Sequence, residues 1–319
     1  MSVAVVGAGA IGGLLGAYLS RSGVEVILIA RGPHLAAMQS RGVTVRSGGA
    51  EFNARPECTD DFTAISGTNV VFLTLKAHSI PAVAESIGSS LARGACIVGV
   101  QNGIPWWYFE DRHLESVDPG GIIARNIPYE KVVGCIAYPA AQVVEPGVIE
   151  HREGNRFTLG EPDGSKSERV QMISSMLVKA GLKAPVQTRI RNELWLKLLG
   201  NATLNPLSAL THASVADLVT SPTMRDLVRT LMEEVDAVAA ALGVEVPLTI
   251  EKRMAGAAAS GEHKTSMLQD LEAGRPLEVD ALVGAVVELA GGAGVPVPTL
   301  DVVYRLAKLL DEKARARTS

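Results

Sequence analysis

Three polar side chains recur at every fourth residue of an otherwise apolar segment, and together they could support proton transfer. Lys197, Asn201 and Asn205 would share one face of a helix, because that spacing is close to one helical turn. Burying polar side chains costs free energy unless they are paired, and burial lowers the pKa of a lysine. A lysine of lowered pKa can donate a proton near neutral pH. The segment therefore predicts a proton donor that faces a cleft; the alternative is a stripe that faces water.

A glycine-rich segment near the N-terminus suggests a second kind of chemistry. Gly7-Ala8-Gly9-Ala10-Ile11-Gly12 follows the apolar run Val3–Val6 and precedes residues at helical spacing. Glycines at these positions allow a tight turn, the approach of a pyrophosphate and close packing of helix and strand. The N-terminus of a helix also attracts phosphate groups. The segment predicts a dinucleotide site, with a plain glycine turn as the alternative.

Two cationic residues indicate which dinucleotide is bound. Arg31 follows the second expected strand, where NAD-binding units usually carry an acidic residue for the ribose 2′-hydroxyl. A guanidinium pairs with a 2′-phosphate instead, so Arg31 favours NADP(H); a solvated surface arginine is the alternative. Lys76 follows the strand Val70–Leu75 and is either a second contact to the adenosine half or an exposed lysine.

Three more residues are candidates for contacts to a nicotinamide or a substrate. Asn102 lies in the Q-N-G segment after the strand Ala95–Val100 and can hydrogen-bond a carboxamide, although Asn-Gly is also common in turns. Ser266 can hold a carboxylate oxygen, and Glu278 can orient an ammonium or bond a hydroxyl group. On spacing alone, a helix cap and an exposed acid are the better interpretations of Ser266 and Glu278.

The elements that must position these residues begin with alternating strands and helical stretches. This alternation predicts an α/β fold with a doubly wound, Rossmann-type parallel sheet. Its expected strands are Val3–Val6, Val24–Ile29, Val43–Arg46, Val70–Leu75 and Ala95–Val100. Short strands and turns from Val132 to Leu159 predict an antiparallel extension of the sheet. A helix over Glu168–Ala180 and a short strand near Pro185–Gln187 complete this part.

After Thr188 the strand pattern stops, and the remaining pattern predicts an all-α domain. Its expected helices are Glu193–Ala209, Thr223–Leu242, Pro247–Ala259, Leu277–Ala290 and Thr299–Ala314, with Pro206 at the end of the first. We therefore predict an NADP-binding domain over residues 1–188 and a helical substrate and catalytic domain over residues 189–319. Ligands are expected at the carboxyl ends of the strands, facing the helical domain.

Composition restricts the class of protein. The chain has 319 residues, 47% of them hydrophobic, and a net charge of −4, which argues against a nucleic-acid partner. No apolar run is long enough to span a membrane, so no membrane partner is expected. Cys58, Cys96 and Cys135 are isolated, which predicts free thiols in a cytoplasmic protein and no metal site. The sequence leaves a homodimer open.

Several motifs, taken in order, resemble those of the ketopantoate reductase (2-dehydropantoate 2-reductase) family and span nearly the whole chain. They are G-A-G-A-I-G, Arg31, T-L-K-A-H, Q-N-G, W-L-K-L-L-G-N-A-T-L-N-P-L-S-A-L, S-M-L-Q-D and P-L-E-V-D. The resemblance implies an oxidoreductase that uses NADPH to reduce 2-dehydropantoate to (R)-pantoate, on the way to pantothenate and coenzyme A.

The same resemblance implies roles for individual residues. It implies Lys197 as the general acid, with Asn102 and Glu278 in the catalytic site and Glu278 near the nicotinamide ribose. The contacts that it implies to substrate or nicotinamide are Asn102, Asn201, Asn205 and Ser266. Lys76 matches a cofactor-binding lysine of the family, and Ala140 matches a backbone contact to the cofactor.

Two departures from the family pattern lie near the expected substrate site. The Q-N-G segment runs into Trp106 and Trp107 and a long insertion up to Tyr129, where typical members have small residues. The stretch Thr211–Asp217 also lacks an asparagine that typical members carry. An alternative is therefore a relative that reduces a branched or aromatic 2-oxo acid, with the two tryptophans shaping its pocket. A third hypothesis is a non-catalytic NADP(H) sensor. The presence of Lys197 and Glu278 argues against it.

Overall fold

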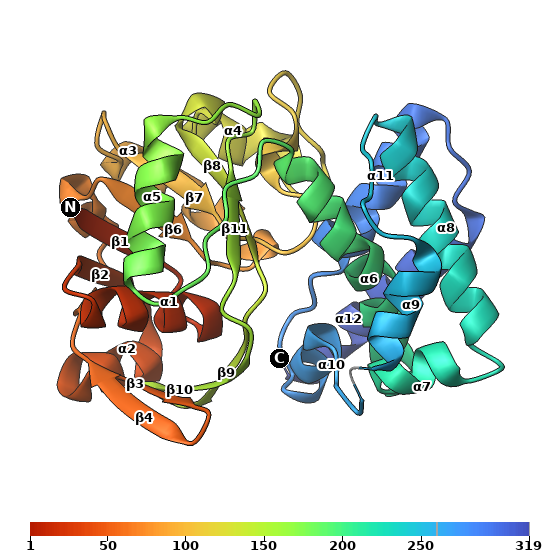
Figure 1. Cartoon of the computed structure of the whole chain (residues 1–319), viewed down its shortest axis with the longest axis horizontal. Helices are drawn as coiled ribbons and strands as arrows, with labels where there is room; N and C mark the ends of the chain where they lie inside the picture. The colour runs from red at the N-terminus through yellow and green to blue at the C-terminus, as the bar shows by residue number, and fades with distance from the viewer. Residues whose placement is uncertain (260, 319) are drawn as a thin grey trace. The chain divides into compact units, whose positions relative to one another are not determined.

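The computed structural model describes residues 1–259 and 261–318, which form two compact units (Figure 1). Unit 1 comprises Met1–Gln101, Trp106–His113 and Gly120–Ile190. Unit 2 comprises Asn102–Pro105, Leu114–Pro119 and the chain from Arg191 onward. The chain division at residue 188, drawn from the sequence, stays a prediction.

Unit 1 is built on a seven-stranded sheet. In spatial order its strands are β11 (Phe157–Gly160), β8 (Val132–Ala137), β7 (Cys96–Gly99), β6 (Val70–Leu73), β1 (Ser2–Val6), β2 (Glu25–Ile29) and β5 (Glu57–Thr59). All neighbours are parallel except β11, which runs antiparallel to β8 at one edge. The predicted α/β class and the parallel sheet are confirmed, and the antiparallel extension is confirmed for β11. Within the stretch Val132–Leu159 expected to form that extension, β8 instead pairs in parallel with β7, and the residues between β8 and β11 contribute to a second sheet. The short strand expected near Pro185–Gln187 is reduced to a single bridge between Leu159 and Val186.

A second sheet of four strands was not expected from the sequence. Its spatial order is β4 (Ala50–Ala54), β3 (Val43–Ser47), β10 (Val148–Glu153) and β9 (Ala140–Glu145). The prediction that Val43–Arg46 joins the parallel sheet was wrong, because this strand pairs with β4 and β10 instead. Gly48 and Gly49, both with positive φ, turn the chain straight back into β4. A parallel neighbour would need a crossover of a dozen or more residues.

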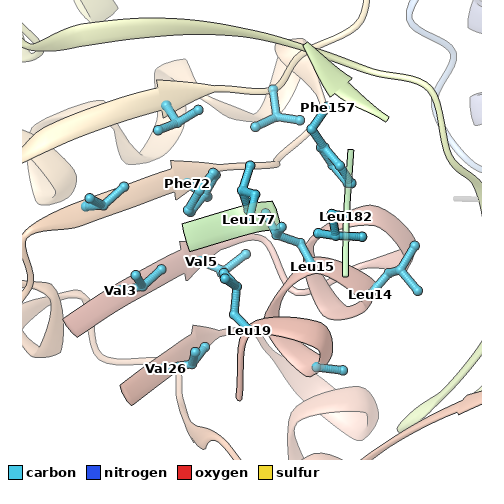
Figure 2. Packing of buried hydrophobic residues seen from close by; sticks show 14 of the residues in the cluster. Val3, Val5, Leu14, Leu15, Leu19, Val26, Phe72, Phe157, Leu177 and Leu182 are labelled. Carbon is cyan, nitrogen blue, oxygen red and sulfur yellow. The ribbon is translucent and has the colours of Figure 1, made fainter. Parts of the chain in front are cut away.

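Helix α1 (Ala10–Arg21) fixes the glycine-rich turn to the centre of the large sheet. Its Leu14, Leu15 and Leu19 are fully buried and pack with Val5 of β1 and Phe72 of β6 (Figure 2). Burial of each such side chain contributes about 1.5–3 kcal/mol. The start of α1 is therefore held firmly against the end of β1.

Shorter helices complete unit 1. The α-helices are α2 (Gly32–Arg41), α3 (Ala84–Ser90), α4 (Ile122–Asn126) and α5 (Glu168–Lys179). The 3₁₀ helices are η1 (Phe62–Gly67), η2 (Ala77–Ser79), η3 (Pro81–Val83), η4 (Trp106–Tyr108), η5 (Pro119–Gly121) and η6 (Tyr129–Lys131). Leu177 of α5 belongs to the same buried cluster as α1 (Figure 2).

The insertion that follows Q-N-G is shared between the two units. Trp107 is 2% exposed and packs in the core of unit 1, where a Cβ built on Gly134 of β8 would lie 2.6 Å from its ring. Trp106 and Trp107 also line a cavity of about 310 Å³ within the insertion. The segment Leu114–Pro119 belongs to unit 2, where the Glu288 carboxylate accepts hydrogen bonds from the Ser116 amide and hydroxyl.

The regular elements of unit 2 are all helices among its described residues, which confirms the predicted all-α part of the fold. Its elements are α6 (Ile190–Thr211), α7 (Val215–Thr220), α8 (Arg225–Ala241), α9 (Ile250–Ala258), α10 (Ser266–Glu272), the π-helix η7 (Asp280–Gly284), α11 (Ala285–Ala293) and α12 (Pro298–Thr318) (Figure 1). The sequence prediction missed α7 and α10. Both begin at a side-chain cap: Ser214 forms a capping box with Asp217, and Thr265 accepts from the Leu268 amide.

The prediction that Pro206 ends its helix was wrong. Pro206 lies inside α6, which continues to Thr211. A proline inside a helix removes one hydrogen bond and costs about 3 kcal/mol. Every residue from 202 to 209 is buried, so tertiary packing on both sides of the proline offsets this cost.

Among the helices of the described residues, none combines the length and the apolar character needed to cross a membrane.

Candidate active site

The glycine-rich turn has the form that a dinucleotide pyrophosphate requires. The amides of Gly7 and Ala8 donate to the carbonyl of Ile29 at the end of β2, at 3.0 and 3.1 Å, and Gly7 has a φ of +98°. A Cβ on Gly12 would collide with the Gly7 backbone and with the Thr74 hydroxyl, so α1 packs closer to β1 than any other residue allows.

The other side of the turn faces open space. Gly9 is exposed, and a Cβ built on it would meet no atom within 4 Å. Gly9 is also the N-cap of α1 and provides no side-chain acceptor for the first amides of the helix. Such amides attract anions. Within unit 1, the residues present therefore fit a bound dinucleotide.

Two cations stand at the carboxyl ends of the two strands that flank β1. Arg31 is exposed and is the N-cap of α2, two residues after the last residue of β2. Lys76 is half-buried and is the N-cap of η2, three residues after the last residue of β6. Since β1 itself ends in the glycine-rich turn, these three adjacent strand ends belong to one edge of the sheet. Ala140, the expected backbone contact, is the first residue of β9.

His34, which the sequence analysis did not name, supports this turn. Its Nε2 lies 2.8 Å from the carbonyl oxygen of Ala8, and its Nδ1 accepts from the Gly147 amide at 3.0 Å. The neutral ring with its proton on Nε2 satisfies both contacts. Burial lowers the pKa of His34, an effect opposed by its hydrogen bond to Ala8. The imidazole thus ties the glycine-rich turn to the turn between β9 and β10.

In unit 2, the lysine of the polar stripe is paired with the asparagine of Q-N-G. Lys197 Nζ donates to Asn102 Oδ1 at 2.6 Å, across 95 positions of the sequence. Both side chains are half-buried, and the residues next to Lys197 on α6, Leu198 and Leu199, are buried. An ammonium in such surroundings needs an acceptor, and the Asn102 amide oxygen supplies it without adding a negative charge.

The other end of the stripe is paired as well. Asn205 is 6% exposed, and its Nδ2 donates to Ser266 Oγ at 3.4 Å, at the start of α10. Asn201 is half-buried between these two contacts on α6. Ser266 itself is exposed, and the capping role that the spacing favoured for it belongs to its neighbour Thr265.

Glu278 stands just before the π-helix η7, and the Q-N-G turn packs on that helix. A Cβ on Gly103 would lie 2.5 Å from the carbonyl carbon of Ala281, and the Ile104 amide donates to the Ala281 oxygen at 2.9 Å. Gly103 has a φ of +81°, which other residues rarely adopt. π-helical turns are frequent at functional sites. Asn102 and Glu278 therefore both lie next to η7 in the sequence or by packing, within unit 2.

Helix α12 holds η7 in place through Asp280, the first residue of η7. The Tyr304 hydroxyl donates to Asp280 Oδ1 at 2.9 Å, and Lys308 Nζ donates to Asp280 Oδ2 at 2.8 Å. Burial and the hydrogen bond to Asp280 raise the pKa of Tyr304 to about 12. The sequence analysis did not name Tyr304 or Lys308, because their spacing along α12 carries no sign of a partner 24 or more residues earlier.

The structure therefore collects the predicted residues in two sets. Unit 2 brings together Lys197 with Asn102, and Asn205 with Ser266, and it also contains Asn201 and Glu278. Unit 1 contains the glycine-rich turn with Arg31, Lys76 and Ala140.

Comparison with known proteins identifies the family. The model "Ketopantoate reductase PanE/ApbA" matches residues 3–164, and the model of the C-terminal part of the same proteins matches residues 189–311. The chain belongs to the ketopantoate reductase family. Its members are oxidoreductases, and the resemblance inferred from the motifs is confirmed.

Individual family members match over nearly the whole chain. A 2-dehydropantoate 2-reductase of Mesorhizobium japonicum is 45% identical and covers 97% of this chain and 98% of its own. A solved structure from Ralstonia solanacearum MolK2 is 36% identical, with a TM-score of 0.93 and 98% coverage of both chains. A 2-dehydropantoate 2-reductase structure from Methylococcus capsulatus is 29% identical, with a TM-score of 0.84 and the same coverage.

The contacts of His34 predict a pH dependence for this ketopantoate reductase family member. Because the pKa of His34 is lowered in the folded state, the unfolded state takes up a proton first as the pH falls below about 6.5. The stabilising effect of the neutral ring is therefore complete above pH 6.5 and is lost as the pH falls towards the lower, folded-state pKa. Urea unfolding of wild type and His34→Gln from pH 8 to pH 5 checks this.

The wild type should lose more free energy of unfolding than His34→Gln over this interval. Parallel curves for the two proteins would show that His34 does not titrate differently in the folded and unfolded states.

Proposed function

We propose that this protein reduces 2-dehydropantoate to (R)-pantoate with NADPH, as the general acid Lys197 delivers a proton to the carbonyl oxygen. The observation that carries the proposal is the 2.6 Å contact between Lys197 and Asn102 in unit 2. Family membership supports the reaction class, and the name of the Mesorhizobium relative supports the substrate. The reduction belongs to the route to pantothenate and coenzyme A.

Bound NADPH would supply a hydride to the carbonyl carbon of the 2-oxo acid. As the hydride arrives, negative charge develops on the carbonyl oxygen, and the Lys197 ammonium stabilises that charge and donates its proton. Asn102 holds the ammonium in place before the reaction and gives up this contact, wholly or in part, to the substrate. A neutral acceptor suits this task, because a carboxylate would raise the pKa of the lysine and weaken it as an acid.

Polar groups along α6 orient the substrate in this proposal. Asn201, Asn205 and Ser266 provide amide and hydroxyl groups that can bond the hydroxyl and carboxylate of 2-dehydropantoate. Asn205 and Ser266 already lie within hydrogen-bonding distance of each other, at 3.4 Å. Glu278, just before η7, would bond a hydroxyl of the nicotinamide ribose.

The preference for NADPH rests on the two cations of unit 1. Arg31 after β2 would pair with the 2′-phosphate, and Lys76 after β6 would add a second positive charge. The first residues of the glycine-rich turn would hold the pyrophosphate; these are Gly7, Ala8, Gly9, Ala10, Ile11 and Gly12. The three buried, free cysteines fit a reducing compartment, and we propose the cytoplasm.

The substrate is tested by NADPH oxidation with a panel of 2-oxo acids. The highest kcat/KM is expected with 2-dehydropantoate, and smaller values with aromatic acids such as phenylglyoxylate. A much higher kcat/KM with a branched or aromatic acid would favour the alternative of a relative with another substrate. Tight NADPH binding without turnover of any member of the panel would favour a sensor.

Arg31→Ala should raise the KM for NADPH and leave the KM for NADH nearly unchanged. The lost charge-assisted contact is worth about 1.5–3 kcal/mol, which corresponds to about a 10- to 150-fold change. Steady-state kinetics with both cofactors measures it. Arg41→Ala, which removes the exposed arginine in the last turn of the same helix, is the matched control. Equal use of NADPH and NADH by the unaltered enzyme would refute the assignment.

Lys197→Ala should lower kcat by roughly 10²- to 10⁴-fold while NADPH binding to unit 1 stays nearly unchanged. Lys197→Arg should not restore the rate, because a guanidinium is too weak an acid. In the wild type the rate should fall at high pH as the neutral amine forms. These values come from stopped-flow rates and a cofactor-binding titration. A variant that raised only KM would show that Lys197 binds substrate and that another group donates the proton.

A further inference from the structure

The guanidinium of Arg253 on α9 lies directly on Gly200 of α6. A Cβ built on Gly200 would lie 2.7 Å from Arg253 Cζ and 2.9 Å from Arg253 Nε, and it would overlap Nη2. A glycine inside a helix costs about 1 kcal/mol relative to alanine. At residue 200 the missing side chain has a use, because it leaves the space that the guanidinium fills.

This position is next to the polar stripe of the proposed active site. Gly200 lies three residues after Lys197 and one before Asn201, so it is a buried neighbour of Lys197 one turn along the same helix. Residues at this spacing are about 5–6 Å apart. The Arg253 guanidinium therefore meets α6 about one helical turn along from the residue that carries the proposed proton donor, and both helices belong to unit 2.

The proposed substrate creates a need for this charge. A 2-oxo acid carries a carboxylate beside its carbonyl group, and Lys197 is already assigned to the carbonyl oxygen. The other proposed substrate contacts, Asn201, Asn205 and Ser266, are neutral. A guanidinium bonds a carboxylate through two parallel N–H donors, so it fixes the orientation of the acid as well as its charge.

The two charged residues just before Arg253 on α9 are placed differently from it. Glu251, two residues before Arg253, is bonded to Arg229 of α8 at 2.7 Å. Lys252 is exposed, whereas Arg253 is half-buried.

We propose that Arg253 binds the substrate carboxylate and makes the enzyme specific for 2-oxo acids over neutral carbonyl compounds, with Gly200 as the position that admits it. This inference rests on the proposed function and assigns one further specificity-determining residue to it.

The experiment compares 2-dehydropantoate with its primary amide as substrates, under saturating NADPH. Arg253→Ala should raise the KM for the acid by about 10- to 100-fold and change the KM for the amide by less than about 3-fold. Arg253→Lys should recover part of the loss, because it keeps the charge without the planar fork. Lys252→Ala, the matched control on the same helix, should leave both KM values unchanged.

Gly200→Ala tests the same contact from the other helix. The added methyl group meets the flexible end of Arg253, so the protein should fold with an unreduced melting temperature. The displaced guanidinium should nevertheless raise the KM for the acid, and combining Gly200→Ala with Arg253→Ala should add little.

An equal rise in KM for acid and amide would overturn the proposal, because it would indicate a general disturbance of the site. An unchanged KM for the acid in Arg253→Ala would also overturn it and would leave the proposed function intact. If the unaltered enzyme reduced no 2-oxo acid, the proposed function would fail, and the role of Arg253 would fail with it.

Discussion

A positively charged side chain on an apolar helix must have an acceptor, and the contact of Lys197 with Asn102 meets this constraint. The Asn102 oxygen accepts from this half-buried ammonium at 2.6 Å, next to the buried Leu198 and Leu199. The contact joins α6 to the segment that follows β7, which lies 95 residues earlier. Asn102 consequently belongs to unit 2, although the strand that leads to it belongs to unit 1. The Lys197 contact and the packing of Gly103 and Ile104 on Ala281 together hold the segment Asn102–Pro105 in unit 2.

Close approach at glycines positions the groups around this contact. Gly103 allows the turn after Asn102 to lie on the carbonyl of Ala281, at the start of the segment that follows Glu278. Gly200 allows the Arg253 guanidinium to lie on α6, three residues along the helix from Lys197. In unit 1, Gly12 brings α1 against the end of β1 in the same way. Gly12 and Gly200 lower the helix propensity of α1 and α6, and each of the three glycines gains a contact that a Cβ would block.

The insertion after Q-N-G adds packing as well as new surface. Trp107 is buried against Gly134 of β8, where the absence of a side chain leaves room for an indole ring. Leu114–Pro119 is bonded to Glu288 of α11 in unit 2, through the Glu115 and Ser116 amides. A segment that departs from the family pattern is therefore part of the structural support of this chain.

The sequence by itself determined the local elements and the chemical types of the proposed site. The glycine-rich turn, the strands of the parallel sheet and the stripe on α6 follow from spacing and side-chain type, because these patterns act over one or two turns of chain. The sequence did not determine that Val43–Ser47 joins a second sheet or that Pro206 lies within a continuing helix. Those outcomes depend on β10, which lies about a hundred residues away, and on packing around α6. The same holds for the partners of Lys197, Asp280 and Gly200, because contacts between distant segments depend on how the chain folds back on itself.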